Sequence, residues 1–180
     1  LVLAASLAGC TFPGRCLVEV TGSLQNYVVQ AKNASCTLEE AYRGFLEATL
    51  SCVRAHDDFD VLGHLTYIGK IFANPNLRAI SEKEYREITD EMFRVLISKG
   101  KGIEVNTSGK DRCGAFLPDE AYLRRFKELG GEIVTVGSDA HAFDRVGQYC
   151  HEACALVNDI FGYVETMLEI AKIAKREERQ

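Results

Sequence analysis

Residues 132–141 read Glu-Ile-Val-Thr-Val-Gly-Ser-Asp-Ala-His, and they are the most informative stretch of the chain. The run 132–136 has the composition of a short buried strand, and an Asp-x-His pair follows it closely. Because side chains two residues apart on an extended backbone point the same way, we expect Asp139 and His141 to converge if the extended backbone continues past the strand. A carboxylate and an imidazole at a strand's carboxyl end are typical of a catalytic metal site. The alternative is that Asp139 caps the next helix and His141 is an ordinary loop residue.

Helical and strand patterns alternate from residue 37 onward. Apolar residues at helical spacing, capping boxes at Thr37/Glu40 and Ser81/Glu84, and stop signals at Gly100 and Gly130 mark the helices. The predicted helices cover about 37–55, 81–100, 118–130 and 144–160, and the predicted strands cover 59–65, 102–107 and 132–137. A further strand is expected to begin at Leu1 and to end near residue 7. Helices between short buried strands predict parallel pairing, and hence an α/β sheet or barrel.

Composition limits the function classes. The chain has 180 residues, of which 47% are hydrophobic, so we expect one domain with a substantial core. The net charge of −5 and the lack of a basic cluster argue against a nucleic-acid-binding protein, and no apolar stretch is long enough to span a bilayer. Residues 1–10 resemble a bacterial lipoprotein cleavage box, but no basic segment precedes them and a buried strand fits equally well. The seven cysteines form no CxxC pair, so we expect a reduced, cytoplasmic protein.

Polar groups follow three consecutive predicted strands. His64 lies at the end of the strand 59–65, Asn106 at the end of 102–107, and Asp139 and His141 just after 132–137. Functional groups gather where parallel strands end, because the loops there converge. For His64 alone, a hydrogen-bonded core histidine is the alternative interpretation. Together the three strand ends predict a shared site.

Three blocks of sequence carry a family resemblance. They are DFDVLGHLTYI at 58–68, GIEVNTSG at 102–109 and LGGEIVTVGSDAH at 129–141. They resemble the C-terminal portion of the histidinol-phosphatase branch of the polymerase and histidinol phosphatase (PHP) superfamily. The resemblance covers about residues 37–160 of a single PHP-like domain spanning 1–180, with 1–36 poorly matched and 161–180 expected as a C-terminal helix or tail.

The resemblance implies a fold, a reaction and a set of site residues. The fold would be part of a distorted seven-stranded (β/α) barrel holding up to three zinc, manganese or iron ions. The reaction would be the hydrolysis of L-histidinol phosphate, a small phosphate ester, to L-histidinol and phosphate in histidine biosynthesis. Carried over by position, Asp139 matches a ligand of the first metal, His64 of the second and His141 of the third, and Asn106 would line the substrate pocket.

The sequence also departs from the family pattern. The His-x-His strand and the further His and Glu ligands that family members carry are absent, and Lys110 and Asp111 stand where Leu-Arg is usual, with Arg112 one position late. We expect Arg112 to substitute in holding the phosphate, because a guanidinium has a long reach. One ligand per ion cannot bind zinc tightly, so we expect a weakly active or inactive form. Two alternatives stay open: another PHP phosphoesterase, or a non-catalytic remnant of a PHP barrel used for binding.

Overall fold

The computed structural model describes residues 2–3, 37–72 and 83–162. The strands are β1 (Val2–Leu3), β2 (Val61–Leu62), β3 (Gly102–Asn106) and β4 (Val134–Gly137). The helices are α2 (Leu38–Ala55), α3 (Tyr67–Phe72), α4 (Lys83–Ser98), α5 (Lys110–Cys113), α6 (Glu120–Glu128) and α7 (Cys150–Phe161), with short 3₁₀ helices η2 (Thr107–Gly109) and η3 (Phe143–Arg145). The first predicted strand beyond Leu3, the capping box at 81–84 and the tail after 162 lie partly or wholly outside the described residues.

The strands form one parallel sheet. Its order in the described part is β1-β2-β3-β4, and each strand pairs in parallel with the next. Val105 on β3 pairs with Val136 on β4, and Asn106 pairs with Gly137, so β3 and β4 end side by side. The parallel α/β class is therefore confirmed, and the seven-stranded barrel stays a prediction.

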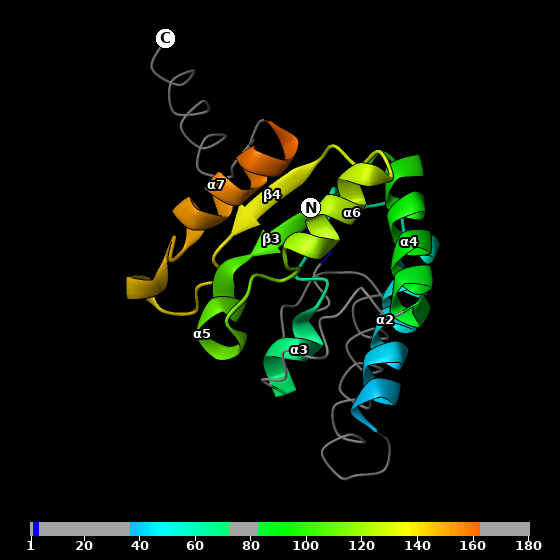
Figure 1. Cartoon of the computed structure of the whole chain (residues 1–180), viewed down its shortest axis with the longest axis horizontal. Coiled ribbons are helices and arrows are strands. Elements are labelled where there is room, and N and C mark those ends of the chain that lie inside the picture. Colours follow the sequence, from blue (N-terminus) through cyan, green and yellow to red (C-terminus); the bar gives the residue numbers. More distant parts are fainter. Residues whose placement is uncertain (1, 4–36, 73–82, 163–180) are drawn as a thin grey trace.

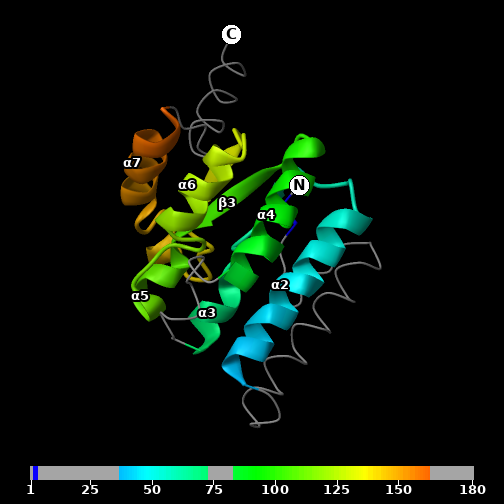
Figure 2. The same ribbon diagram turned by 45° about the vertical axis from the view of Figure 1, so that its right-hand side comes forward.

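A layer of helices covers the sheet, as Figures 1 and 2 show. Helices α2, α4, α6 and α7 lie in that order, each in contact with the next. Their inner faces are apolar: Phe45 on α2, Met92 on α4 and Phe126 on α6 are at most 2% exposed. Helices with one apolar stripe must bury it against another element, and here the sheet supplies the partner.

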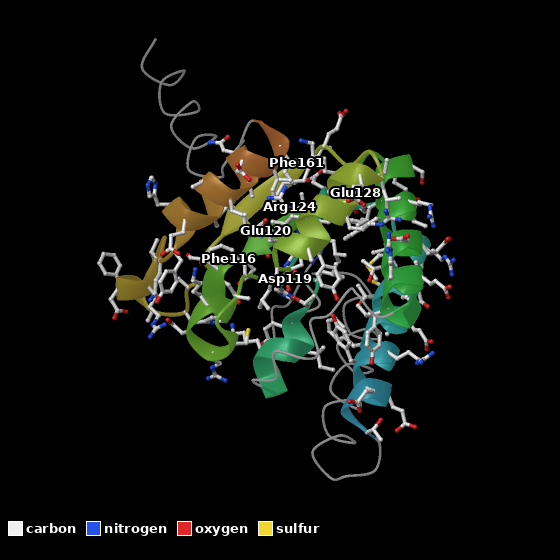
Figure 3. All side chains as sticks on the ribbon, viewed as in Figure 1. Phe116, Asp119, Glu120, Arg124, Glu128 and Phe161 are labelled. Atoms are coloured by element: carbon white, nitrogen blue, oxygen red, sulfur yellow. The ribbon has the colours of Figure 1, made fainter. Side chains whose placement is uncertain are left out.

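Charged side chains occupy the outer faces of the helices (Figure 3). Glu120, Arg124 and Glu128 follow one another at four-residue intervals on α6, and they therefore share a face. The Arg124 guanidinium lies 2.7 Å from the Glu120 carboxylate and 3.3 Å from that of Asp159 on α7. These exposed pairs add little stability, but they show that α6 is oriented with its apolar side inward.

The sequence located most helix ends. Thr37 and Glu40 form the predicted capping box, with Thr37 N–H donating to the Glu40 carboxylate at 2.7 Å and Glu40 N–H donating to Thr37 Oγ1 at 3.1 Å. Gly100 and Gly130 adopt positive φ just after α4 and α6, as their stop signals predict. The third helix begins at Glu120 rather than at Pro118, because Asp119 is its N-cap and accepts from Ala121 N–H.

The strand predicted at 132–137 begins at Val134, and two other predicted elements are shorter by several residues. The strand predicted at 59–65 covers only Val61–Leu62, because His64 adopts φ 33° and turns the chain into α3, a helix that the sequence analysis did not predict. The helix predicted at 144–160 begins at Cys150, because η3 and a left-handed Tyr149 (φ 59°) precede it. Both departures lie at the carboxyl ends of strands or in the loops that follow them.

No helix in the described part of the chain is long and apolar enough to cross a membrane. Four cysteines lie there, namely Cys52, Cys113, Cys150 and Cys154, and the first three of them are buried. Cys150 and Cys154 lie one turn apart on α7, as their spacing predicts.

Candidate functional site

A cavity of about 580 Å³ opens beyond the carboxyl ends of β3 and β4. Its walls come from α3, from the η2–α5 segment that follows β3, and from the loop between β4 and α7. The lining residues are Tyr67, Lys70, Thr107, Ser108, Asp111, Arg112, Ser138, Asp139, Ala140, His141, Ala142, Arg145, Gln148 and Tyr149. Three of the five predicted site residues, Arg112, Asp139 and His141, are therefore in one cavity.

Asp139 and His141 lie close together, but not because of the extended backbone that the sequence predicted. The extended backbone does not continue past β4, because Asp139 adopts φ 48°. This left-handed turn nevertheless places Nε2 of His141 3.5 Å from Oδ1 of Asp139. The carboxylate is 30% exposed and the imidazole 79% exposed, so both can be reached from the cavity. Asp139 caps neither of the helices that follow, because the N-cap of η3 is Ala142 and that of α7 is Tyr149.

His64 lies next to the cavity and does not line it. Its side chain is buried, at 5% exposure, and its ring packs 4.8 Å from that of Tyr67, which does line the cavity. Burial lowers the pKa of His64, and the nearby Asp139 carboxylate opposes that shift. Its Nδ1 atom is buried without a hydrogen-bond partner in the described part of the protein. A buried nitrogen left unpaired is costly, so the alternative of a fully hydrogen-bonded core histidine does not describe His64.

Asn106 is also one step away from the cavity. It is 1% exposed, and its Oδ1 accepts hydrogen bonds from Ser108 N–H at 3.0 Å and Ser108 Oγ at 2.5 Å. The Ser108 hydroxyl is itself in the cavity wall and lies 3.3 Å from Oδ2 of Asp139. Asn106 therefore acts on the cavity through Ser108, and any direct contact with a ligand stays a prediction.

Lys70 is a cavity residue that the sequence analysis missed. Its ammonium donates to Ser108 Oγ at 2.7 Å and lies 3.7 Å from the Asp139 carboxylate. The side chain is only 16% exposed, which strengthens these contacts relative to a surface ion pair. No signal in the sequence pointed to Lys70, because the helix that carries it was not predicted.

Two arginines in the cavity wall, Arg112 and Arg145, have different surroundings. Asp111 accepts a hydrogen bond from the Tyr149 hydroxyl at 2.8 Å and pairs with Arg145. The bond from Tyr149, followed by the one from Arg145, lowers the pKa of Asp111. Arg112 is exposed and lines the cavity, and no ion pair involves it among the described residues. Among the lining residues that the structure describes, Arg112 is therefore the cation that no carboxylate neutralises.

The donor set fits a metal only in part. Asp139 and His141 are close together, and the unpartnered Nδ1 of His64 is the kind of atom that a metal would satisfy. Within residues 2–3, 37–72 and 83–162, no group of three His, Cys, Asp or Glu side chains is arranged to hold an ion. Catalytic zinc sites use three protein ligands, so these residues need others to bind zinc tightly.

No protein-family model matches this chain. Individual relatives do match it. It is 32% identical over 112 residues to a probable histidinol-phosphatase of Clostridium acetobutylicum, covering 61% of this chain and 42% of the relative. It is 33% identical over 142 residues to the histidinol-phosphatase of Lactococcus lactis, covering 78% of this chain and 49% of the relative. The chain thus spans about half the length of the curated relatives it matches.

A solved structure matches as well. It is the crystal structure of histidinol phosphate phosphatase from Lactococcus lactis in complex with zinc, L-histidinol and phosphate. The TM-score is 0.55 at 29% sequence identity, and the match covers 71% of this chain and 48% of that one. The sequence and structural comparisons therefore agree on one family.

Proposed function

We propose that the cavity is the substrate site of a metal-dependent phosphomonoesterase acting on L-histidinol phosphate in histidine biosynthesis. The premise is that this chain belongs to the histidinol-phosphatase family. The products are L-histidinol and inorganic phosphate. Water adds its oxygen to phosphorus, the bond from phosphorus to the ester oxygen breaks, and a proton passes to the departing histidinol oxygen. The observation that carries the proposal is the convergence of Arg112, Asp139 and His141 on one cavity.

The cavity suits a small phosphate ester. Its volume of about 580 Å³ is in the usual range for a small-molecule site. Its walls carry three basic side chains, Lys70, Arg112 and Arg145, and two acidic ones, Asp111 and Asp139. Arg112 carries no competing ion pair in the described part of the chain, and its planar guanidinium matches phosphate geometry. We therefore assign Arg112 to the phosphate group.

His64, Asp139 and His141 would contribute to holding divalent zinc, manganese or iron. When bound, such ions neutralise phosphate charge and lower the pKa of an attacking water. The chain's own residues prepare the site: Lys70 and Ser108 hold the Asp139 carboxylate at the cavity wall, and Asn106 holds Ser108. Because the described residues supply too few ligands for a complete centre, we expect the isolated chain to bind the ester and to hydrolyse it negligibly.

The test is a titration of the chain with L-histidinol phosphate by isothermal calorimetry, with and without added zinc or manganese. We expect saturable binding that is at least tenfold tighter than that of L-histidinol, since the phosphate supplies the charge-assisted contacts. Arg112→Ala should weaken binding of the ester about tenfold and leave L-histidinol unaffected. Arg54→Ala is the matched control, because Arg54 pairs with Glu91 on the helical layer and does not line the cavity.

Three outcomes would contradict the proposal. The first is an affinity for L-histidinol equal to that for its phosphate ester. The second is tighter binding of a nucleotide or sugar phosphate, which would favour another phosphoesterase of the same superfamily. The third is phosphate release from the ester at an ordinary enzymatic rate by the isolated chain, which would contradict the expected incompleteness of its metal ligands.

A further inference from the structure

Glu104 occupies a central position that the proposed function does not yet explain. It lies in the middle of β3, between β2 and β4, and its carboxylate reaches the ends of both neighbouring strands. A carboxylate that is partly buried within a sheet needs compensating hydrogen bonds. In the described structure these bonds come from groups that belong to the site.

Two donors meet on one oxygen of Glu104. The backbone N–H of His64 donates to Oε2 at 3.1 Å, and Nδ2 of Asn106 donates to the same atom at 3.3 Å. The first bond restrains the backbone of His64, which follows β2 and has φ 33°. A non-glycine residue adopts this conformation only when its surroundings hold it there. Glu104 is therefore part of what holds His64 in place.

The second bond fixes which way the Asn106 amide faces. An ionised carboxylate only accepts hydrogen bonds, so Nδ2 must point to Glu104 and Oδ1 must point the other way. Oδ1 then accepts from both the backbone and the hydroxyl of Ser108, which stands in the cavity wall. If the amide were reversed, Ser108 would lose its acceptor.

The end of β4 is shaped around the same carboxylate. A Cβ atom added at Gly137 would lie 2.5 Å from Oε1 of Glu104, closer than atoms of this kind can approach. Gly137 is two residues before Asp139, so the β4 end, like the β2 end, is built to fit Glu104. One side chain thus touches three strand ends, each of which carries a predicted site residue.

We infer that Glu104 is a positioning residue of the cavity, whose carboxylate holds the His64 backbone and the Asn106 amide in the arrangement that binds a phosphate ester. The inference rests on the proposed function for its link to the ester. The geometry that it describes can be tested without any ligand. It also predicts that the shape of the acceptor matters and that its negative charge does not.

The experiment compares four variants of the full chain by NMR and by calorimetry with L-histidinol phosphate. Glu104→Ala removes the acceptor, whereas Glu104→Gln keeps one oxygen that can accept both bonds. Gly137→Ala leaves Glu104 in the sequence and displaces its carboxylate. Glu128→Ala is the control, because it removes the same charge from an exposed position on α6.

We expect Glu104→Ala and Gly137→Ala to shift the side-chain amide resonances of Asn106 and the imidazole resonances of His64 in the unliganded protein. Both should weaken L-histidinol phosphate binding about tenfold, the cost of one misplaced polar contact. The affinity of Glu104→Gln for L-histidinol phosphate should stay within about threefold of the wild-type affinity, and the affinity of Glu128→Ala should equal that of the wild type. If Glu104→Ala fails to fold, Gly137→Ala and Glu104→Gln still give opposite expectations.

Two results would overturn the inference. One is a Glu104→Gln variant with the same spectral shifts and affinity loss as Glu104→Ala or, where that variant does not fold, as Gly137→Ala, because charge rather than position would then be responsible. The other is unchanged resonances of His64 and Asn106 in Gly137→Ala and Glu104→Ala. A wild-type chain that binds no L-histidinol phosphate, together with the expected spectral shifts, would reject the proposed function and leave the positioning role of Glu104 in place.

Discussion

The helical body and the cavity edge of this protein are built in opposite ways. In the body, meaning α2, α4 and α6 with the core beneath them, large apolar side chains such as Phe93 and Phe126 are fully buried. At the cavity edge, meaning the residues that follow β2, β3 and β4, buried polar groups take their place: His64 is 5% exposed and Asn106 is 1% exposed. The body is arranged for packing, and the edge is arranged for polar contacts at some cost to stability.

Backbone conformation shows the same contrast. In the described part, the three non-glycine residues with positive φ are His64, Asp139 and Tyr149, which line the cavity or lie next to it. Where helices of the body must turn sharply, Gly100 and Gly130 adopt the left-handed conformation without steric cost. Strained non-glycine residues persist where their side chains are needed, which is typical of functional sites. Changes in the body should therefore alter stability, and changes at the edge should alter binding.

The largest effect on stability is expected from Phe126→Ala. The Phe126 ring is fully buried and meets Phe93 edge to face, with ring centroids 5.1 Å apart. Truncation should lower the free energy of unfolding by about 3–5 kcal/mol, measured by urea denaturation. The same change at Phe143, which is 97% exposed beside the cavity, should cost less than about 0.5 kcal/mol. Equal losses at the two positions would contradict the contrast between body and edge.

A smaller, pH-dependent effect is expected from Asp90→Asn. The Arg125 guanidinium on α6 donates two hydrogen bonds, of 2.7 and 2.6 Å, to the Asp90 carboxylate on α4. These bonds lower the pKa of Asp90 from its ordinary value of 3.8. A lowered folded-state pKa means that the stabilisation is complete above about pH 4–5 and is lost as the pH falls through the folded-state value.

Urea denaturation between pH 2 and pH 7 tests this pair. Asp90→Asn should be less stable than the wild type by about 1–3 kcal/mol at pH 7, and the difference should close toward pH 2. Glu91→Gln on the same helix breaks an exposed pair with Arg54 and should cost less than about 1 kcal/mol at any pH. A pH-independent difference for Asp90→Asn would show that the ion pair is not its cause.

The capping box of α2 should contribute about 1 kcal/mol. Thr37→Ala removes the hydroxyl that accepts from Glu40 N–H, leaving that donor to water. Thermal denaturation should show a lowered midpoint for Thr37→Ala, whereas Thr37→Ser keeps the acceptor and should remain close to the wild type. Equal midpoints for the alanine and serine variants would mean that this cap does not stabilise the fold.

The sequence was informative where the signals are local. Thr37 and Glu40 predict a helix start within four residues, and Gly100 and Gly130 predict helix ends, because each motif satisfies backbone groups of its own turn. The order of strands and helices followed from these boundaries, and so did the class of fold. The family resemblance pointed to Arg112, Asp139 and His141, which the structure brings to one cavity.

The remaining features depend on contacts between distant residues. The turn at His64 ends β2 early, and its backbone bond to Glu104 spans 40 residues of sequence. Lys70 reaches Ser108 across 38 residues, and it lies on a helix too short to give a periodic signal. Neither partner is visible from composition or spacing, so Glu104 and Lys70 were not predicted. The carboxyl ends of the strands are where local rules fail, because tertiary contacts decide the backbone there.

The smallest effect on stability, and the sharpest separation of binding from folding, is expected from Asp139→Asn. Asparagine tolerates the left-handed conformation of this position and keeps the side chain's shape, so the free energy of unfolding should change by less than about 0.5 kcal/mol.

Without added metal, L-histidinol phosphate should bind to Asp139→Asn about threefold more tightly than to the wild type, since one negative charge leaves the cavity and Lys70 loses its ion pair. Added zinc should improve binding to the wild type and improve it less in the variant, because a neutral amide is a poor zinc ligand while His64 and His141 remain. Asp144→Asn makes the same change on the exposed η3 segment, outside the cavity wall, and should match the wild type in both titrations. If zinc improves binding equally in wild type and Asp139→Asn, then Asp139 is not a metal ligand and the cavity edge owes its strained backbone to some other contact.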